Sequence, residues 1–389
     1  MHATEALTEA DRQFTICNAC RYCEGLCAVF PAMEMHKTFN DADLNYLANL
    51  CHSCGACYHD CQFAPPHEFA VNIPRTLAQV RNDSYKSYAW PRSFARVFEH
   101  NGLWLAAIAA LSVTVFILGF IAFNAPGELF AVQTGEGAFY RLMPHNAMIT
   151  IFGAAFLYAI FALVMGWRNF WRDTNAVQNV VEDTPSIWQA VRDAATMRNL
   201  DGGGVGCYNE DERPSDNRRL FHHLTFYGFL FCFAATSVGT IYHYGFGRIA
   251  PYPWWDLPPM LGKIGGIGLV IGTAGLFAAK RRREPALVDE SRRDMDAAFL
   301  VMLFLTAATG LALHGLRATP LMGTLLAVHL GVVFAFFITM PYSKFVHGLY
   351  RFAALCRNAM ALRSGLCAQP SRAEAPVDEA VGARGSGGR

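Results

Sequence analysis

Long apolar stretches follow a soluble N-terminal segment along this chain. Residues 1–100 contain no such stretch. Beyond them, apolar residues collect in blocks of about 20, the length that a helix needs to cross a bilayer, and each block lacks charges over its central length. We expect six transmembrane helices, at about 102–124, 146–167, 221–243, 261–279, 297–316 and 322–346.

Lysine and arginine are distributed unevenly between these blocks. They gather in the connection 168–219 and in the connection after the fourth block, whereas the opposite side has little beyond Arg141, Arg248, Lys263 and Arg317. The positive-inside rule then places both termini in the cytoplasm. Residues 1–14 are acidic and polar, unlike a signal peptide. We therefore expect a multi-pass protein of the bacterial inner membrane.

These patterns predict an all-α protein with three parts. Residues 1–100 form a cytoplasmic domain, whose cysteines, described below, make it ferredoxin-like. Residues 101–350 form a six-helix membrane domain, whose histidines, described below, make it cytochrome b-like; it has a cytoplasmic insertion at 168–219, which we interpret as a surface cover without chemistry. Residues 351–389 form a cytoplasmic tail, largely disordered because its end is rich in Ala, Gly, Pro, Ser and charge.

The charge and the cysteine content of the chain limit which kinds of ligand it is expected to bind. The formal net charge is only +1 and no charge run resembles a basic arm, so we expect no nucleic-acid partner. Eight of the twelve cysteines lie between Cys17 and Cys61. A cytosolic segment keeps thiols reduced, so these cysteines are free to bind metal.

The eight cysteines form the motif C-x2-C-x2-C-x3-C twice. Three closely spaced cysteines wrap one corner of a cubane, and the fourth cysteine of such a run typically binds the other cluster. Zinc sites use pairs rather than triples. We expect two [4Fe–4S] clusters, one held by a first set (Cys17, Cys20, Cys23 and Cys61) and one by a second set (Cys51, Cys54, Cys57 and Cys27).

Bacterial ferredoxins place Pro directly after the fourth cysteine, whereas Ala28 and Gln62 stand there in this chain. The stretch 43–50 also has helical spacing. Both points favour a helical ferredoxin domain, like those of succinate dehydrogenase and heterodisulfide reductase subunits.

Histidines inside membrane segments are functional candidates by default. His329 and His347 bound the sixth block, 18 residues apart, which places them on one face of a continuous helix and about 27 Å apart along its axis. Such spacing suits one haem b level near each membrane surface. His222 or His223 would supply the second inner ligand, with His222 slightly favoured, and His243, His314 or, less favoured, His145 the second outer ligand.

A low-spin haem b needs two axial nitrogens, and its propionates are anionic. Arg218, Arg219 and Lys344 lie next to the inner histidines in the sequence and are candidates to pair with those propionates. The outer level would hold a second haem or a quinone.

The stretch 329–347 resembles the last helix of respiratory nitrate reductase gamma subunits, where both histidines bind haem, and Leu220–His222 resembles its partner helix. That family has another ligand ten residues later, where this chain has Cys232. The whole chain resembles the tricarballylate-utilisation protein B (citrate-utilisation protein B) family, supported by the stretches 202–207 and 222–229.

The second resemblance implies a soluble FAD-dependent tricarballylate dehydrogenase as partner and membrane quinone as electron acceptor. The chain itself shows no flavin- or nucleotide-binding glycine loop, so we expect an electron-transfer subunit without a substrate site. A membrane subunit of a heterodisulfide-reductase-like complex and a membrane-bound Fe–S redox sensor remain alternatives. A transporter is disfavoured because the helices lack midplane charges.

Overall fold

The computed structural model describes residues 2–175, 184–211, 213–290 and 293–365. The fold is almost entirely helical, as predicted. Its only strands in these ranges are β1 (Cys207–Tyr208) and β2 (Pro214–Ser215), which pair antiparallel. The soluble helices are α1 (Glu5–Cys20), α2 (Val29–Glu34), α3 (Asp41–Leu50), α4 (Ala56–His59), α5 (Ile73–Tyr88) and α9 (Thr184–Thr196), with the 3-10 turns η1 (Arg92–Phe98), η3 (Gly202–Gly204) and η4 (Pro285–Leu287).

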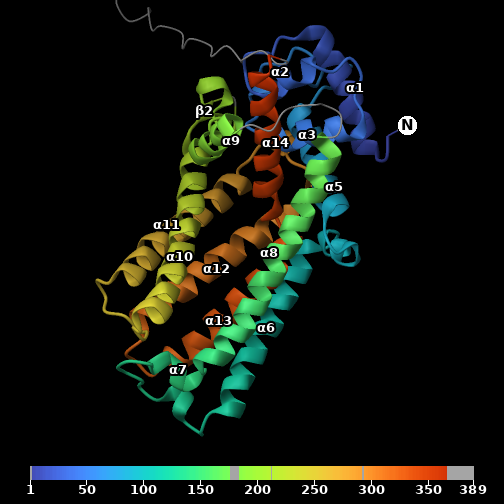
Figure 1. Ribbon diagram of the computed structural model, residues 1–389. Helices are drawn as coiled ribbons and strands as arrows, with labels where there is room; N and C mark the ends of the chain where they lie inside the picture. The colour runs from blue at the N-terminus through green and yellow to red at the C-terminus, as the bar shows by residue number, and fades with distance from the viewer. Residues whose placement is uncertain (1, 176–183, 212, 291–292, 366–389) are drawn as a thin grey trace, which may run out of the picture.

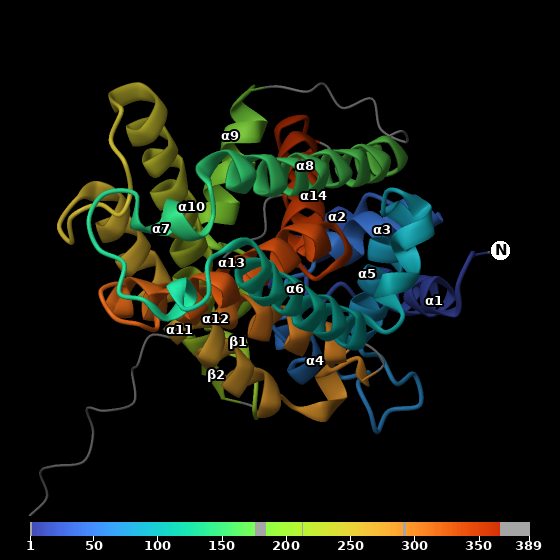
Figure 2. The same ribbon diagram turned by 90° about the horizontal axis from the view of Figure 1, so that it is seen from below.

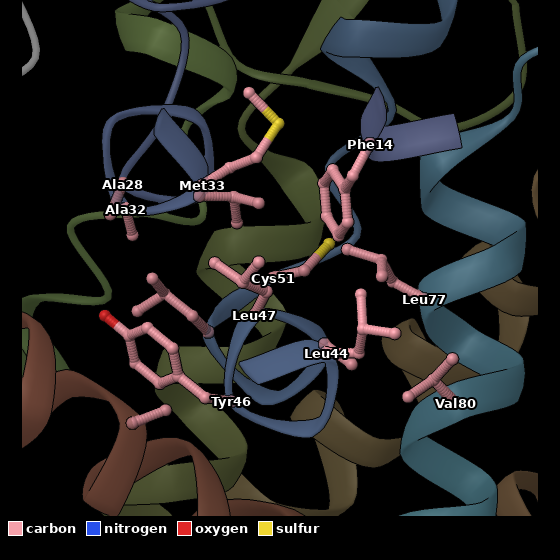
Figure 3. Close-up of a cluster of buried hydrophobic side chains, with 14 of the residues drawn as sticks. Phe14, Ala28, Ala32, Met33, Leu44, Tyr46, Leu47, Cys51, Leu77 and Val80 are labelled. Carbon is pink, nitrogen blue, oxygen red and sulfur yellow. The ribbon is translucent and has the colours of Figure 1, made fainter. Parts of the chain in front are cut away.

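Side-chain caps begin the main helices of the N-terminal domain. The Thr4 side chain accepts a hydrogen bond from the Leu7 amide at the start of α1. In the same way, the side chain of Asn40 caps the start of α3 and that of Asn72 caps the start of α5, each by accepting from an amide of its own helix. Each cap satisfies a backbone donor that has no partner within its helix. The apolar faces of these helices meet in one buried core, in which Figure 3 shows Phe14, Leu47 and Cys51 close together.

Six helices in the described ranges are long and apolar enough to cross a membrane, so the prediction of a multi-pass membrane protein is confirmed. They are α6 (Asn101–Phe123), α8 (His145–Asn175), α10 (Asn217–Phe246), α11 (Leu257–Arg281), α12 (Arg293–Leu316) and α13 (Met322–Thr339), the last extended by the 3-10 turn η6 (Met340–Tyr342). The short elements η2 (Glu128–Phe130) and α7 (Ala138–Leu142) connect α6 to α8. Figure 1 shows the spans running from the N-terminal domain toward α7.

The sixth predicted helix was too long. A continuous helix over 322–346 is wrong, because α13 ends at Thr339, a turn follows at Pro341, and Ser343 is extended before α14 (Val346–Arg363) begins. Proline removes a backbone donor and disfavours helical geometry in the residue before it. His329 therefore lies on α13 and His347 on α14, so the one-face argument for this pair does not apply.

The spans pack in a chain in which α10 contacts α11, α11 contacts α12, α12 contacts α13, and α13 contacts both α6 and α8. Figure 2 shows α13 at the centre of this arrangement. Glycine permits the close approach of α10 and α11, since a Cβ at Gly228 would lie 2.8 Å from the Gly265 carbonyl oxygen and a Cβ at Gly272 only 2.6 Å from the Thr225 amide. Small residues at helix contacts are typical of membrane bundles.

Helix α14 joins the membrane domain to the N-terminal domain. Its residues Ala354, Leu355 and Met360 belong to the same buried core as α1, α3 and α5. Within the predicted tail 351–389, α14 is helical to Arg363. The end of the tail, for which composition predicts disorder, lies outside the described residues from 366 on, as does 176–183 in the predicted insertion.

Candidate functional site

The structure brings the eight motif cysteines together as two sets of four. One cavity is lined by Cys27, Cys51, Cys54 and Cys57, and a second cavity by Cys17, Cys20, Cys23 and Cys61. In each set, three cysteines come from one motif and the fourth from the other. These are the crossed sets named from the sequence, although cluster binding itself stays a prediction.

Local backbone geometry produces the crossing. Helix α1 ends at Cys20, and Arg21 adopts a left-handed conformation (φ 58°) that turns the chain back after the first two cysteines. Ser53 (φ 55°) and Gly55 (φ 91°) do the same within the second motif. Only glycine adopts such φ values freely, so two non-glycine residues here indicate backbone held by its surroundings.

The two sets differ in part in burial. Cys51 and Cys54 of the second set are buried, whereas its other members, Cys27 and Cys57, are partly exposed like all four cysteines of the first set. Burial raises the pKa of Cys17, Cys23 and Cys54 to about 12. The free thiols therefore hold their protons until metal ions displace them.

The donor sets fit cubane clusters better than single ions. In the described ranges, no three His, Cys, Asp or Glu side chains gather tightly enough to hold one metal ion. Four thiols spread around a cavity match a cubane, which binds each thiolate at a different corner. Amide donors are also close: the Ser53 amide donates to Cys51 Sγ at 3.3 Å, and the Gln62 amide to Cys20 Sγ at 3.8 Å.

The insertion between α8 and α10 covers the second set. The Tyr208 amide donates to the Cys54 carbonyl at 2.8 Å. Buried Cys207 packs with Cys54 and Ala56 in one apolar cluster, together with Met197. The part of the insertion at 197–208 is therefore a cover over one cysteine set rather than an independent surface element.

Four arginines converge on the backbone of the second motif; we call Arg81, Arg218, Arg283 and Arg351 the arginine clamp. They come from α5, from the start of α10, from the residues after α11 and from α14. Their donors reach three successive carbonyl groups, at residues 51, 52 and 53.

The individual contacts are short. Arg81 and Arg351 donate to the Cys51 carbonyl oxygen at 3.1 and 2.9 Å. Arg218 donates to the Ser53 carbonyl at 2.6 Å and to the His52 carbonyl at 3.3 Å. Arg283 donates to the Ser53 carbonyl at 2.8 Å and to the Ser53 hydroxyl at 3.1 Å.

A cavity of about 220 Å³ lies between this motif and the membrane helices. The arginine clamp lines it, together with His52, His222 and His347. Lys280 and Lys344 also line it, but both pair with Asp296. The lining is therefore strongly basic, and it extends from His52 and Ser53 of the second motif to the inner histidines, although none of the eight motif cysteines is part of it.

The inner histidines meet as the sequence suggested. The ring centroids of His222 and His347 lie 6.1 Å apart, whereas His223 stacks with Tyr227. His347 Nδ1 lies against the Lys344 carbonyl oxygen, which can only accept a hydrogen bond. Nδ1 therefore carries the proton of the neutral imidazole, and Nε2 is unprotonated. His222 Nδ1 is buried and has no partner among the described residues.

The outer histidine candidates do not gather at His329. His329 Nδ1 lies 2.9 Å from the Thr309 hydroxyl on α12. His243 stacks on His145 with ring centroids 3.8 Å apart, and His314 contacts Trp254. The structure therefore brings neither His243 nor His314 to His329.

The proposed propionate partners are already engaged. Arg218 binds the cysteine motif, and Lys344 Nζ lies 3.0 Å from Asp296 Oδ1. Arg219 donates to the Thr196 carbonyl. Cys232, at the position of the additional ligand in the nitrate reductase resemblance, faces Gly265 of α11.

The site prediction from the sequence did not include His52, Cys207 or three members of the clamp, Arg81, Arg283 and Arg351. The position of His52 inside the second motif could have pointed to it. Nothing in the sequence points to the arginines, because they bind backbone carbonyl groups, which every residue has.

Comparisons with known proteins agree with this architecture. A family profile described as "Citrate utilization protein B" matches residues 99–367, and one described as "Citrate utilization protein B Fer4-like domain" matches residues 10–87. The chain is 46% identical over 363 residues to "Citrate utilization protein B" of Escherichia coli, covering 93% of this chain and 94% of that protein. No solved structure gives a significant match.

Proposed function

The chain belongs to the citrate utilization protein B family, and from this premise we propose that it is a membrane-bound electron-transfer subunit. Its family and its Fer4-like domain fit an iron–sulfur membrane protein of citrate or tricarballylate utilization. In our proposal, electrons leave the reduced flavin of a soluble FAD-dependent dehydrogenase of the tricarballylate type. They cross two [4Fe–4S] clusters and haem b and reach membrane quinone.

The observation that carries this proposal is the shared cavity. The second cysteine motif contributes His52 and Ser53 to it, and the membrane helices contribute His222 and His347. A cofactor held at the second cysteine set would thus lie next to one held by the two histidines. Electron transfer needs this kind of proximity.

His222 and His347 would hold the haem in this proposal, because their ring centroids lie only 6.1 Å apart although the two residues come from α10 and α14. The hydrogen bond from His347 Nδ1 to a carbonyl fixes the tautomer and ring orientation, as is usual for metal-binding histidines. Haem b bound here would supply one-electron chemistry.

Each group of residues has a separate part in this proposal. The first cysteine set, partly exposed, accepts electrons from the partner protein. The cover at 197–208 keeps water from the second set. We place the cysteine sets on the cytoplasmic side of a bacterial inner membrane, on the basis of the arginine-rich connections.

Replacing His347 with Ala tests the proposal. We expect anaerobically purified His347→Ala to lose the haem b absorbance while keeping its [4Fe–4S] EPR signals, and to stop reducing quinone when dithionite reduces the clusters. His223→Ala is the matched control, because His223 neighbours His222 in the sequence but stacks on Tyr227. Full haem content and normal quinone reduction in His347→Ala would refute this route.

A further inference from the structure

The arginine clamp touches the second cysteine motif only, and this asymmetry has a redox consequence. We propose that the clamp raises the reduction potential of the [4Fe–4S] cluster at the second cysteine set above that of the first, and so makes the second cluster the exit toward the membrane. This inference rests on the proposed function and adds a direction to it.

The clamp holds an unusual backbone. Ser53 has φ 55°, and its carbonyl oxygen accepts hydrogen bonds from both Arg218 and Arg283. A serine in this conformation persists only when its surroundings determine it. Two charged donors on one oxygen supply that constraint, and they fix residues 52 and 53 to the start of α10 and to the residues after α11.

The positive charges of the clamp are only partly compensated. Within the described ranges, none of the four arginines forms an ion pair with a carboxylate. Two carboxylates line the same cavity: Asp296 is paired with Lys280 and Lys344, although its charge also acts on Arg283, and Asp289 accepts a hydrogen bond from Asn82. Partly buried like charges that crowd together are costly unless an anion lies close to them. The second cysteine set, once it holds a cluster through four thiolates, is such an anion.

Reduction adds one more negative charge to a cluster, so nearby cations stabilise the reduced state and raise its potential. The clamp does not line the cavity of the second cysteine set itself, but it binds the carbonyl groups of residues 51–53, and the Arg218 charge acts on Cys54. The first set has a different environment. Among the described residues, Arg21 is the one Lys or Arg that lines its cavity, and the Arg21 Nε donates to the Asn18 carbonyl. Tyr22, inside the first motif, is 72% exposed, so water screens charge there.

The electron step is balanced without a proton. One electron leaves the reduced cluster at the first set, which becomes oxidised, and enters the cluster at the second set, which becomes reduced. No bond forms or breaks. The reductant is the reduced flavin of the partner dehydrogenase, as in the proposed function.

An EPR-monitored redox titration of the full-length protein in detergent tests this inference. Cys20→Ser and Cys54→Ser, each of which removes a ligand from one set, first assign the two signals. We expect Arg283→Gln to lower the reduced-to-oxidised ratio of the second cluster at least tenfold at a fixed potential, which is about 59 mV for a one-electron couple. The first cluster in the same sample should keep its potential.

Matched variants separate charge from structure. Arg219→Gln removes the same charge from the neighbour of a clamp residue, but Arg219 contacts Thr196 instead of the motif, so we expect no comparable shift. Arg283→Lys keeps the charge and should stay closer to the wild-type potential than Arg283→Gln. If Arg283→Gln loses the second cluster, Arg218→Gln replaces it, because the Ser53 carbonyl then keeps its other donor.

Two results would overturn the inference: an unchanged second potential with both clusters present, or equal shifts of both clusters. The titration needs neither dehydrogenase nor quinone, so its outcome is independent of the haem route. A wild-type protein that binds no clusters would instead refute the proposed function.

Discussion

Replacing Arg357 should loosen the N-terminal domain from the membrane bundle. Arg357 lies on α14 and is only 1% exposed. Its Nη2 lies 3.1 Å from Oδ1 of Asp43 on α3, and its Nη1 donates to the carbonyl of Thr174 on α8. Its guanidinium carbon also lies 3.9 Å from the ring centroid of Tyr46. One side chain thus joins helices that are far apart in the sequence.

The magnitude follows from the charge left behind. Among the described residues, His36 Nδ1 is the remaining basic group close to the buried Asp43 carboxylate in Arg357→Met, at 3.4 Å. Burial and the Arg357 charge both lower the pKa of His36, whereas Asp43 raises it, so the variant makes His36 easier to protonate and the loss is largest at high pH. Removing one partner of a buried ion pair costs about 3–5 kcal/mol. Opening of the domain should therefore become roughly a hundredfold to a few thousandfold more frequent.

Limited proteolysis of the full chain in detergent measures this change, because cleavage tracks the population of the open form when closing is fast. Arg12→Met is the control: Arg12 pairs with Glu9 at the surface, where such a pair contributes about 0–1 kcal/mol. Asp43→Asn combined with Arg357→Met should recover much of the loss. Cleavage of Arg357→Met at the wild-type rate would refute the reasoning, and a double variant no better than the single one would assign the loss to packing on Tyr46.

Three further predictions test other parts of the molecule. Cys61→Ser should damage the EPR signal of the first cysteine set; damage to the second set would contradict the crossed assignment. Gly272→Val should lower the stability of the detergent-solubilised protein, measured by thermal unfolding, by about 1–3 kcal/mol, because the new side chain forces α10 and α11 apart. Gly119→Val on α6 is the control and should lower it less, because a Cβ at Gly119 meets nothing within 4 Å. The hydrogen bond to Asp41 raises the pKa of His2. This contact therefore stabilises the fold fully below pH about 6.5, and the stabilisation is lost as the pH rises through the raised pKa of His2. An NMR titration in which Asp41→Asn leaves the pKa of His2 unchanged would contradict this.

The membrane helices could be predicted from the sequence because length and apolar composition alone select them. Their ends were less accurate. Pro341 was visible in the sequence, yet the apolar run across it favoured one long helix, and the structure breaks that helix after Thr339. Local proline chemistry here outweighs the apolar pattern.

The histidines show a second limit. Helical periodicity gives the face of a residue on its own helix, but it does not say which helix lies opposite. Thr309 is the partner of His329, and His145 is the partner of His243. Such pairs depend on the order in which the spans pack, and the sequence does not state that order.

The arginine clamp also bears on topology. Arg218 and Arg283 belong to the two connections whose positive charge predicted their side of the membrane, and both reach Ser53 of the N-terminal domain. These contacts require residues 1–100, both connections and α14 to share one side of the bundle. This conclusion does not depend on the number of positive charges in each connection. The positive-inside rule is then needed only to identify that side as the cytoplasm. The positive charge from which the sequence predicts the side of these connections thus includes arginines that bind the carbonyl groups of the cysteine motif.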